Sequence, residues 1–283
     1  MKIFTLIQEI KNYINSNKKE GKTIGFVPTM GALHQGHISL LEKAKKENNI
    51  TAASIFVNPL QFNNKEDLKK YPRTLETDLE KLNVAGCDVV FNPTADEMYF
   101  ELRARNQKTD AVIDLEDLDK VMEGVQRPRH FQGVCIVVKK LFEIIEPNKA
   151  YFGEKDFQQL AVIKHMVNTL NIPVEIIACP TLREEDGLAM SSRNTLLTPD
   201  ERKNAPFIYK TLLEAKETQG TISQIKKWVT DQINSNHFMK LEYFEIVNAE
   251  TLMPLHSVND AKEIRACIAV KMGSVRLIDN IPF

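Results

Sequence analysis

The sequence predicts an α/β fold in which a Rossmann-like, doubly wound parallel sheet is followed by a smaller C-terminal α+β domain. Three observations support this prediction. Short apolar runs alternate with segments of helical periodicity as far as Pro180, and beyond it two successive helical segments precede three strand-like segments. The chain has 283 residues, of which 43% are hydrophobic, enough to bury a core in one large domain or in two unequal ones. We therefore expect two domains, at residues 1–181 and 182–283.

The first part of the chain is expected to repeat a strand-and-helix unit. Apolar residues recur at helical spacing from Ile3 to Ile14, which predicts an opening amphipathic helix that Gly21 ends. The strands expected after it are at 23–27, 51–57, 89–91, 150–152 and 174–178, and the helical regions are at 38–44, 65–82, 134–145 and 157–170. Alternation of this kind favours a parallel sheet with helices on both faces.

A different order of elements is expected after Pro180. The helical regions are at 201–217 and 222–234, and the strands are at 243–248, 264–271 and 275–279. The sequence Met-Gly-Ser at 272–274 has the chemistry of a tight turn, which predicts a β-hairpin between the last two strands. This change of pattern is the reason for placing the domain boundary near residue 181.

Composition excludes several classes of protein. Lys and Arg number 37 and Asp and Glu 38, so the formal net charge is -1 and supplies no broad basic field for a nucleic-acid backbone. The cysteines have neither the paired spacing of a zinc site nor that of a disulfide framework, and we expect all four to be small buried hydrophobes in a reducing compartment. No apolar run approaches the roughly 20 residues that span a bilayer. We expect a cytoplasmic protein with no nucleic-acid or membrane partner.

A first candidate phosphate site lies at residues 28–37, between a predicted strand and a predicted helix. Unpaired N–H groups and the positive end of a helix dipole attract phosphate at such a junction. Gly31 and Gly36 allow the backbone to approach a ligand, while His34 and His37 can both donate to phosphate oxygens from one side of a helical turn. A pair of surface histidines is the competing interpretation. Metal ligation is disfavoured because no third ligand has a suitable spacing.

Two further segments have phosphate-compatible chemistry. Residues 183–194 lie at the expected domain boundary, and the sequence Ser-Ser-Arg at 191–193 offers two hydroxyls and a guanidinium that suit triphosphate oxygens. Residues 151–159 follow a predicted strand, where Lys155 offers a point charge and Asp156 can cap the next helix. Each segment alone is also compatible with a solvated loop. The coincidence of three such segments at sheet or domain edges favours a nucleotide site.

In their order along the chain, these segments resemble the pantothenate synthetases (pantoate–β-alanine ligases), a family within the HIGH-motif nucleotidyltransferase superfamily. The resemblance runs through residues 28–37, 56–62, 71–74, 151–160 and 186–194. It implies an ATP-dependent condensation of (R)-pantoate with β-alanine through a pantoyl-adenylate, releasing AMP and pyrophosphate. In such an enzyme the pantoate carboxylate attacks the α-phosphorus of ATP, and the β-alanine amine then attacks the activated acyl group.

The resemblance also implies roles for individual residues. The residues implied in catalysis are His37 as proton donor, His34 at the transferring phosphorus, and Lys155, Ser191, Ser192 and Arg193 at the triphosphate. The implied ATP-binding residues are Met30, Gly31, Ala32, Leu33, His34, Gln35, Gly36, His37, Gly153, Glu154, Lys155, Asp156, Leu182, Met190, Ser191, Ser192 and Arg193. The implied pantoate-binding residues are Pro28, Met30, Gln61 and Gln159, and Gln61 would also border β-alanine.

The family pattern further implies a metal ion and an assembly. Mg²⁺ would be held largely by the phosphates of ATP, and no protein ligand is assigned to it. Residues 1–181 would form the nucleotide- and pantoate-binding domain, and residues 182–283 would form a lid. A homodimer is implied as well.

Two positions depart from the family pattern. Gln35 stands where the pattern has Glu, and we expect its side chain to point away from ATP. Arg129 stands where the pattern Arg-Pro-Gly-His-Phe has Gly. An arginine is strained if this position requires a positive φ. Our interpretation is that the position tolerates a side chain.

Two other functions stay open. An adenylyl- or cytidylyltransferase of the same superfamily shares the histidine motif, but it does not require the segments around Gln61 and Gln159 or the C-terminal domain. A non-catalytic nucleotide-binding module keeps the fold without the chemistry, which the presence of Lys155 and Arg193 beside the histidine pair disfavours. An aminoacyl-tRNA synthetase fits poorly because the chain has no evident anticodon domain and no basic excess.

Overall fold

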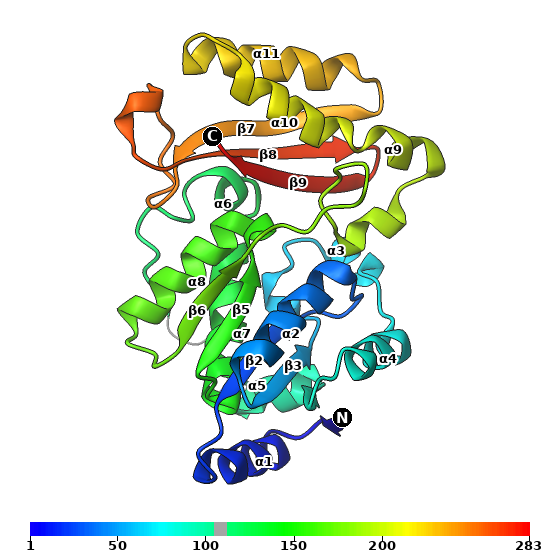
Figure 1. The fold of residues 1–283 in the computed structure, drawn as a ribbon, viewed down its shortest axis with the longest axis vertical. Helices are drawn as coiled ribbons and strands as arrows, with labels where there is room; N and C mark the ends of the chain where they lie inside the picture. Colours follow the sequence, from blue (N-terminus) through cyan, green and yellow to red (C-terminus); the bar gives the residue numbers. More distant parts are fainter. Residues whose placement is uncertain (105–111) are drawn as a thin grey trace. The chain divides into compact units, whose positions relative to one another are not determined.

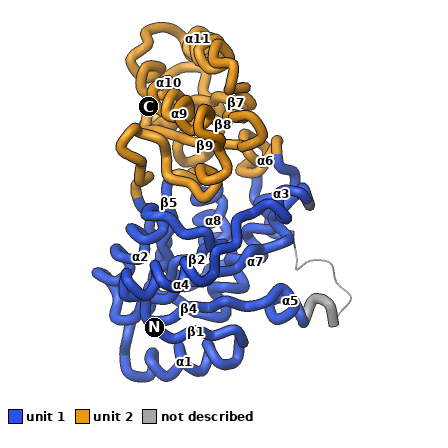
Figure 2. Tube along the Cα trace, turned by 90° about the vertical axis from the view of Figure 1, so that its right-hand side faces the viewer, with its two compact units in different colours: residues 1–116, 127–154, 159–179 blue, residues 117–126, 155–158, 180–283 orange. Residues whose placement is uncertain are grey.

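The structure, a computed structural model, describes residues 1–104 and 112–283. The chain forms two compact units, which Figure 2 distinguishes by colour. The first unit comprises residues 1–116, 127–154 and 159–179, and the second comprises residues 117–126, 155–158 and 180–283. Two short internal segments are therefore grouped with the C-terminal part of the chain.

A six-stranded sheet forms the centre of the first unit (Figure 1). The strands are β1 (Lys2–Phe4), β2 (Ile24–Thr29), β3 (Ile50–Ile55), β4 (Val89–Phe91), β5 (Lys149–Gly153) and β6 (Glu175–Cys179). All pairings are parallel, in the spatial order β1-β4-β3-β2-β5-β6. The central strands are almost wholly buried, as expected for a parallel sheet covered on both faces. The predicted doubly wound sheet is confirmed.

Helices cover both faces of this sheet. The helices of the first unit are α1 (Ile7–Lys19), α2 (Gln35–Glu47), α3 (Lys65–Lys70), α4 (Leu75–Val84), α5 (Ala95–Ala104), α7 (His130–Ile145) and α8 (Phe157–Thr169), whose first two residues belong to the second unit. Val27 of β2 shares an apolar cluster with Leu41 of α2 and Leu82 of α4. Its neighbour Phe26 points to the opposite face. There its ring packs edge-on against Phe142 of α7, with the centroids 6.4 Å apart.

The opening of the chain differs from the prediction of a helix. Residues 2–4 form β1, which pairs with β4 and places Ile3 opposite Val90. Ile3 is 48% exposed, whereas Ile10 and Ile14 are buried on the apolar face of α1, so the helical spacing does not extend back to the start of the chain. Pairing with an otherwise open sheet edge therefore outweighs the local periodicity.

Two predicted helical regions are each divided. The region at 65–82 consists of α3 and α4 with Pro72 between them, and the region at 201–217 consists of α9 (Pro199–Asn204) and α10 (Phe207–Glu217) with Pro206 between them. Proline has no N–H to donate and its ring crowds the preceding turn, so a helix is interrupted there.

The winding of the sheet changes direction between β2 and β5, which are neighbours. From β2 the chain continues through β3 to β4, and from β5 it continues to β6 on the other side. In open α/β sheets, ligands bind outside the carboxyl ends of the strands at such a switch point. In the first unit this location is the loop after β2 and the end of β5.

A three-stranded antiparallel sheet organises the second unit. Its strands, in the order β7-β8-β9, are β7 (Met239–Asn248), β8 (Ile264–Met272) and β9 (Val275–Pro282). Apolar side chains of α10 and α11 (Ile222–Ser235), among them Leu212 and Val229, share a buried cluster with Ile268 of β8. Gly273, at a φ of 55°, lies in the turn where Met272 pairs with Val275, so the predicted hairpin is confirmed. The short helix α6 (Met122–Gln126) also belongs to this unit.

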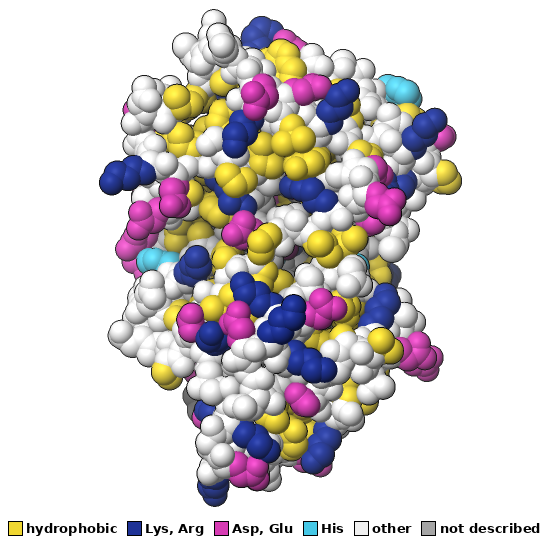
Figure 3. Space-filling view, viewed as in Figure 1, with side chains coloured by type: hydrophobic (Ala, Val, Ile, Leu, Met, Phe, Trp, Pro, Cys, Tyr) yellow, Lys and Arg dark blue, Asp and Glu magenta, His cyan; other side chains and the backbone are white. Residues whose placement is uncertain are grey.

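Charged side chains of both signs are interspersed on the face shown in Figure 3, in keeping with the formal net charge of -1. Within the described ranges, every helix is too short or too polar to traverse a lipid bilayer. The cysteines Cys87, Cys135, Cys179 and Cys267 are all buried, as expected. Burial raises the pKa of the Cys87 and Cys267 thiols to about 12 and also raises the pKa of Cys179, so these thiols are neutral in the native state.

Candidate functional site

The N-terminus of α2 presents the histidine pair. His34 is the N-cap residue in an extended conformation, and His37 lies in the first turn. The Nδ1 atom of His34 accepts a hydrogen bond from the backbone N–H of Gly36 at 3.2 Å, and Nδ1 of His37 accepts from the backbone N–H of His34 at 3.3 Å. The two ring centroids are 4.1 Å apart. The rings thus lie side by side at the start of the helix, as their spacing predicts.

These hydrogen bonds define the tautomer of each neutral imidazole. A backbone N–H can only donate, so an Nδ1 atom that accepts from it carries no proton, and the ring proton is on Nε2. Each Nε2–H group is a hydrogen-bond donor. The helix adds the partial positive charge of its N-terminal end. This arrangement gathers donors and positive potential where an anionic oxygen is best stabilised.

The loop that leads into His34 is held by a buried carboxylate. Asp78 of α4, only 1% exposed, accepts hydrogen bonds from the backbone N–H groups of Ala32 at 2.8 Å and Leu33 at 2.7 Å. The hydroxyl of Thr74 donates to the same carboxylate at 3.2 Å. Charge-assisted bonds of this kind are stronger than neutral ones, so Asp78 fixes the path of the backbone just before the helix.

Lys81 also holds this loop, because its Nζ atom donates a hydrogen bond to the carbonyl of Leu33 at 2.6 Å. Gly31 has a φ of 81°, and a Cβ atom there would lie 3.0 Å from the Asp78 carboxylate. Glycine therefore satisfies both the backbone conformation and the close approach of the carboxylate.

A buried polar network orients Gln61, the last residue of the 3₁₀ helix η1 (Pro59–Gln61). Its Oε1 atom accepts from Nδ2 of Asn58 at 3.1 Å, and its Nε2 atom lies 3.0 Å from the sulfur of Met30. Asn58 is fixed in turn, because its Oδ1 atom accepts from the hydroxyl of Tyr99 at 2.7 Å. Gln61 is 7% exposed and Asn58 is 1% exposed. Two of the residues implied for pantoate, Gln61 and Met30, are thereby brought together.

The backbone of Gln61 is held by the start of α7. The Nδ1–H group of His130 donates a hydrogen bond to the Gln61 carbonyl at 2.8 Å. Gly133, one turn further, allows this approach, because a Cβ atom there would lie 2.3 Å from the carbonyl oxygen of Leu60. Nδ2 of Asn58 also donates to the Gly133 carbonyl at 3.0 Å. The side chains of His130 and Asn58 therefore join α7 and η1 where their backbones approach closely.

Arg129, the N-cap of α7, has a φ of 66° and a ψ of 0°. This is the left-handed region, so the position has the positive φ that favours glycine. The structure accommodates an exposed arginine side chain here at the cost of backbone strain.

In the second unit, Lys155 and Ser191 line one small hollow together with Asn194 and Asp279. The side chain of Lys155 is 18% exposed, with its Nζ atom 3.7 Å from the carboxylate of Asp156. The carboxylate of Asp279 is paired with both terminal nitrogens of Arg183, at 2.7 and 2.9 Å. Within the described part of the chain, the buried Oδ1 atom of Asn194 has no hydrogen-bond partner.

The residues leading up to Ser191 form a tight loop. The backbone N–H of Met190 donates to the carbonyl of Leu182 at 3.0 Å, and the turn between them passes through Gly187 at a φ of 91°. Ser191 then caps the 3₁₀ helix η3 (Ser192–Leu196), with its Oγ atom accepting from the N–H of Arg193 at 3.2 Å. Leu182, Met190 and Ser191 are therefore neighbours in space.

The predicted site residues fall into two groups. Those in the first unit are Pro28, Met30, Gly31, Ala32, Leu33, His34, Gln35, Gly36, His37, Gln61, Gly153, Glu154 and Gln159. Those in the second unit are Lys155, Asp156, Leu182, Met190, Ser191, Ser192 and Arg193. Of the first group, Gln35 is exposed and Gln159 is half-buried at the start of α8.

Sequence reasoning missed the residues that hold these groups in position. Asp78 contacts Leu33 across 45 positions of the chain, and His130 contacts Gln61 across 69. No local pattern indicates such pairings. Asn58 does lie within the segment of family resemblance at 56–62, three positions before Gln61, and His130 stands at the His of the pattern Arg-Pro-Gly-His-Phe. These two matches were the signals that could have identified them.

A doubly wound sheet with a donor-lined helix N-terminus at its switch point defines an α/β nucleotide-binding protein. The family model described as Pantoate-beta-alanine ligase matches residues 2–282. The chain belongs to the pantoate–β-alanine ligase family.

Individual relatives agree with this membership. The chain is 50% identical to the pantothenate synthetase of Porphyromonas gingivalis, with 100% of this chain and 99% of the relative covered. It resembles the crystal structure of pantothenate synthetase from Thermus thermophilus with a TM-score of 0.90 and 41% identity, over 99% of each chain. It also resembles the pantoate-beta-alanine ligase of Francisella tularensis complexed with Beta-gamma ATP and Beta-alanine, with a TM-score of 0.82 and 37% identity over 100% and 97% of the two chains.

Proposed function

We propose that this chain catalyses the ATP-dependent condensation of (R)-pantoate with β-alanine, forming pantothenate, AMP and pyrophosphate. The observation that carries the proposal is the histidine pair at the N-terminus of α2, where two Nε2 donors accompany the positive end of a helix at the switch point of the sheet. The names of the relatives and the ligands of the Francisella complex support the same reaction.

In the first half-reaction, a carboxylate oxygen of pantoate attacks the α-phosphorus of ATP. The bond from that phosphorus to the bridging oxygen breaks, and pyrophosphate leaves with the electron pair, so pantoyl-adenylate is formed. Negative charge increases on the oxygens around the phosphorus, and His34 and His37 stabilise it by donating through Nε2, with His37 as the proton donor. Lys155 and residues 191–193 neutralise the β- and γ-phosphates.

Gln61 holds pantoate through its amide, with Gln159 as a second amide and Pro28 and Met30 as an apolar wall. The support for this role is the network around Gln61, which fixes the amide before a substrate arrives and so reduces the entropy cost of binding. In the second half-reaction the β-alanine amine, bordered by Gln61, attacks the acyl carbon. AMP leaves with the electron pair of the anhydride bond, and the nitrogen loses a proton.

Mg²⁺ accompanies ATP in this scheme. Within residues 1–104 and 112–283, no three His, Cys, Asp or Glu side chains gather as a metal site. Mg²⁺ commonly binds through substrate phosphates and retains several waters, so the triphosphate itself supplies suitable ligands. The ion would neutralise charge on the departing pyrophosphate.

Residues 1–181 are proposed as the nucleotide- and pantoate-binding domain and residues 182–283 as a lid. Segment 155–158, which contains Lys155 and Asp156, is grouped with the second unit. A homodimer located in the cytoplasm completes the proposal, and gel filtration with light scattering tests the assembly by giving twice the mass of one chain.

The function is tested by incubating the purified protein with ATP, Mg²⁺, pantoate and β-alanine and measuring AMP, pyrophosphate and pantothenate. Equal amounts of the three products are expected, and omission of pantoate abolishes pyrophosphate release. A stable adenylylated product without free AMP would instead identify an adenylyltransferase. ATP binding without pyrophosphate release in the full mixture would identify a non-catalytic module.

A further inference from the structure

The short segment 155–158, which begins with Lys155, is held directly by the antiparallel sheet of the second unit. Nδ2 of Asn280 on β9 donates to the carbonyl oxygen of Lys155 at 2.9 Å. Asn280 is 3% exposed, and its Oδ1 atom accepts from Nε of Arg265 on β8 at 2.7 Å. The guanidinium of Arg265 also lies over the ring of Phe157, 4.4 Å from the centroid. Two adjacent strands, β8 and β9, therefore hold the backbone of Lys155 and the ring of Phe157, the first residue of α8.

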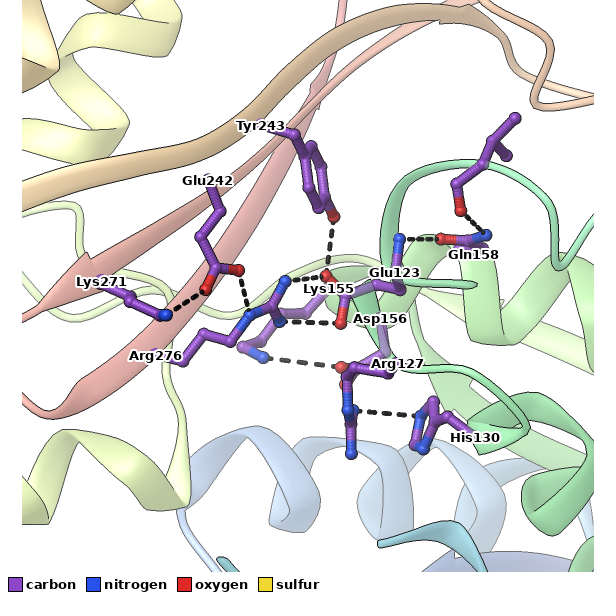
Figure 4. Close-up of polar contacts among 11 residues, drawn as sticks. Glu123, Arg127, His130, Lys155, Asp156, Gln158, Glu242, Tyr243, Lys271 and Arg276 are labelled. Carbon is purple, nitrogen blue, oxygen red and sulfur yellow. Dashed lines mark hydrogen bonds and ion pairs between the residues drawn. The ribbon is translucent and has the colours of Figure 1, made fainter. Parts of the chain in front are cut away.

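The last residue of this segment, Gln158, provides a second anchor through residues 117–126 (Figure 4). Its Oε1 atom accepts from the backbone N–H of Glu123 at 2.9 Å. Its Nε2 atom donates to the carbonyls of Leu118 at 2.7 Å and Val121 at 2.9 Å. Gln158 is 5% exposed, so all these bonds are shielded from water. The amide thereby links the start of α8 to three backbone groups of residues 117–126.

Glu123 connects that second anchor back to the sheet. Arg276 on β9 donates to both carboxylate oxygens of Glu123, at 2.8 and 2.6 Å, and Tyr243 on β7 donates its hydroxyl at 2.9 Å. Glu242 accepts from Nε of Arg276 at 2.5 Å and pairs with Lys271 at 3.3 Å. As Figure 4 shows, the carboxylate of Glu123 lies between Arg276 and Tyr243. A bidentate pair of this kind fixes orientation as well as distance.

We infer that the three-stranded sheet positions Lys155 for ATP, with Asn280 and Glu123 as positioning residues. Asn280 acts through the carbonyl of Lys155, and Glu123 acts through the side-chain amide of Gln158. This inference rests on the proposed role of Lys155 at the β- and γ-phosphates. Lysine carries its charge on a flexible four-carbon stem, so the place of the ammonium depends on where the main chain is held. Holding the Lys155 carbonyl at one end of the segment and the Gln158 amide at the other reduces the entropy lost when the ammonium meets phosphate.

The first test is Asn280→Asp. The new carboxylate keeps an acceptor for Arg265, which favours folding, but it loses the donor to the Lys155 carbonyl and places an oxygen against it. We expect the Kd for ATP, measured by isothermal titration calorimetry without pantoate, to rise at least tenfold. The Kd for AMP should stay within twofold, because AMP lacks the phosphates that Lys155 is proposed to meet. A merely structural role would weaken both nucleotides alike.

The matched control is Lys226→Gln, which changes the net charge by the same amount as Asn280→Asp and breaks the Lys226–Glu245 ion pair of the same unit. It should leave both nucleotide affinities unchanged. An unchanged ATP affinity in Asn280→Asp, or equal losses for ATP and AMP, overturns the inference. A wild-type protein that makes no pantothenate in the complete mixture contradicts the proposed function instead, so the two failures are distinguishable.

Arg276→Lys is the second variant, in case Asn280→Asp does not fold. It retains the charge but loses the bidentate contact with Glu123. A threefold or greater loss of ATP affinity with AMP affinity unchanged is expected, and circular dichroism confirms that the variant is folded. A folded Arg276→Lys protein with wild-type ATP affinity overturns the inference.

Discussion

His37 serves the fold through one ring nitrogen and the proposed chemistry through the other. Its Nδ1 atom accepts from the backbone at the start of α2, while Nε2 carries the proton assigned to the reaction. A substitution that keeps the acceptor and removes the donor can therefore separate the two tasks.

Asparagine at this position provides that separation. His37→Asn keeps an acceptor for the backbone N–H of His34, so we expect the free energy of unfolding to change by less than about 1 kcal/mol. Pyrophosphate release from ATP and pantoate should fall by about 100-fold or more, since a positioned acid or oxyanion donor is lost. His37→Ala, the comparison, should lose the same activity and also the cap. Retention of the rate in His37→Asn, or an unfolded circular dichroism spectrum, would contradict the assignment.

Arg129 carries strain that a single substitution can remove. A φ of 66° costs an L-residue about 1–2 kcal/mol. Glycine removes this cost, but it offsets part of the gain because its unfolded chain has greater conformational freedom. We expect Arg129→Gly to raise the free energy of unfolding by about 0.5–1 kcal/mol, measured by urea denaturation. Arg129→Ala retains a Cβ atom and should give no such gain. Equal stabilisation by both variants would mean that the side chain, and not the backbone, is responsible.

Individual side-chain contacts were the part of the structure that the sequence predicted least well. The histidine pair was predictable because the two residues are three positions apart on one turn. Asp78 and Asn280 were not, because their partners Ala32 and Lys155 lie 46 and 125 positions away. Such contacts exist only once the elements have packed.

At the scale of the element, the contact between α7 and η1 depends on the absence of one side chain. Glycine within a helix normally costs about 1 kcal/mol relative to alanine, so Gly→Ala usually stabilises. At Gly133 the added Cβ would lie 2.3 Å from the carbonyl of Leu60 and 2.7 Å from the N–H of Gln61.

We therefore expect Gly133→Ala to reverse the usual sign and to destabilise the protein by about 1–3 kcal/mol, as overpacking does. The KM for pantoate should rise as Gln61 moves, while the KM for ATP changes less. Urea denaturation and steady-state kinetics measure the two effects. Gly153→Ala is the stability control, because a Cβ there meets nothing within 4 Å. A stabilised Gly133→Ala protein would show that the helix can move away without cost.

Most elements were predictable from periodicity and turn residues, including the parallel strands and the hairpin at Gly273. The exception at the N-terminus has a physical cause. Residues 2–4 are compatible with either a helix or a strand, and only the presence of β4 beside them decides the outcome. Pairing at the edge of a sheet depends on tertiary contacts, so the spacing of apolar residues within the segment cannot predict it.

At the scale of the whole molecule, the buried thiols report on how the two units unfold. Cys87 belongs to the first unit and Cys267 to the second, and each has a pKa of about 12 because of burial. Since only the thiolate is nucleophilic, neither should react with iodoacetamide in the native protein.

Because segments 117–126 and 155–158 make the chain cross repeatedly between the units, we expect both thiols to become reactive at the same urea concentration. Mass spectrometry of labelled peptides measures each site separately. Coincident midpoints indicate one cooperative transition. Labelling of Cys267 at a clearly lower urea concentration than Cys87 would show instead that the second unit opens independently.

This discontinuous course of the chain limits where two members of the family can be recombined into a chimera. A recombination point at residue 180 would transfer Asn280 and Arg276 but leave behind their partners Lys155 and Glu123. A chimera joined there would combine a sheet from one parent with segments 117–126 and 155–158 from the other. A chimera should fold when residues 117–126, 155–158 and 180–283 all come from the same parent. The unit that can be exchanged between relatives is therefore discontinuous in the gene, although its parts are packed together in the protein.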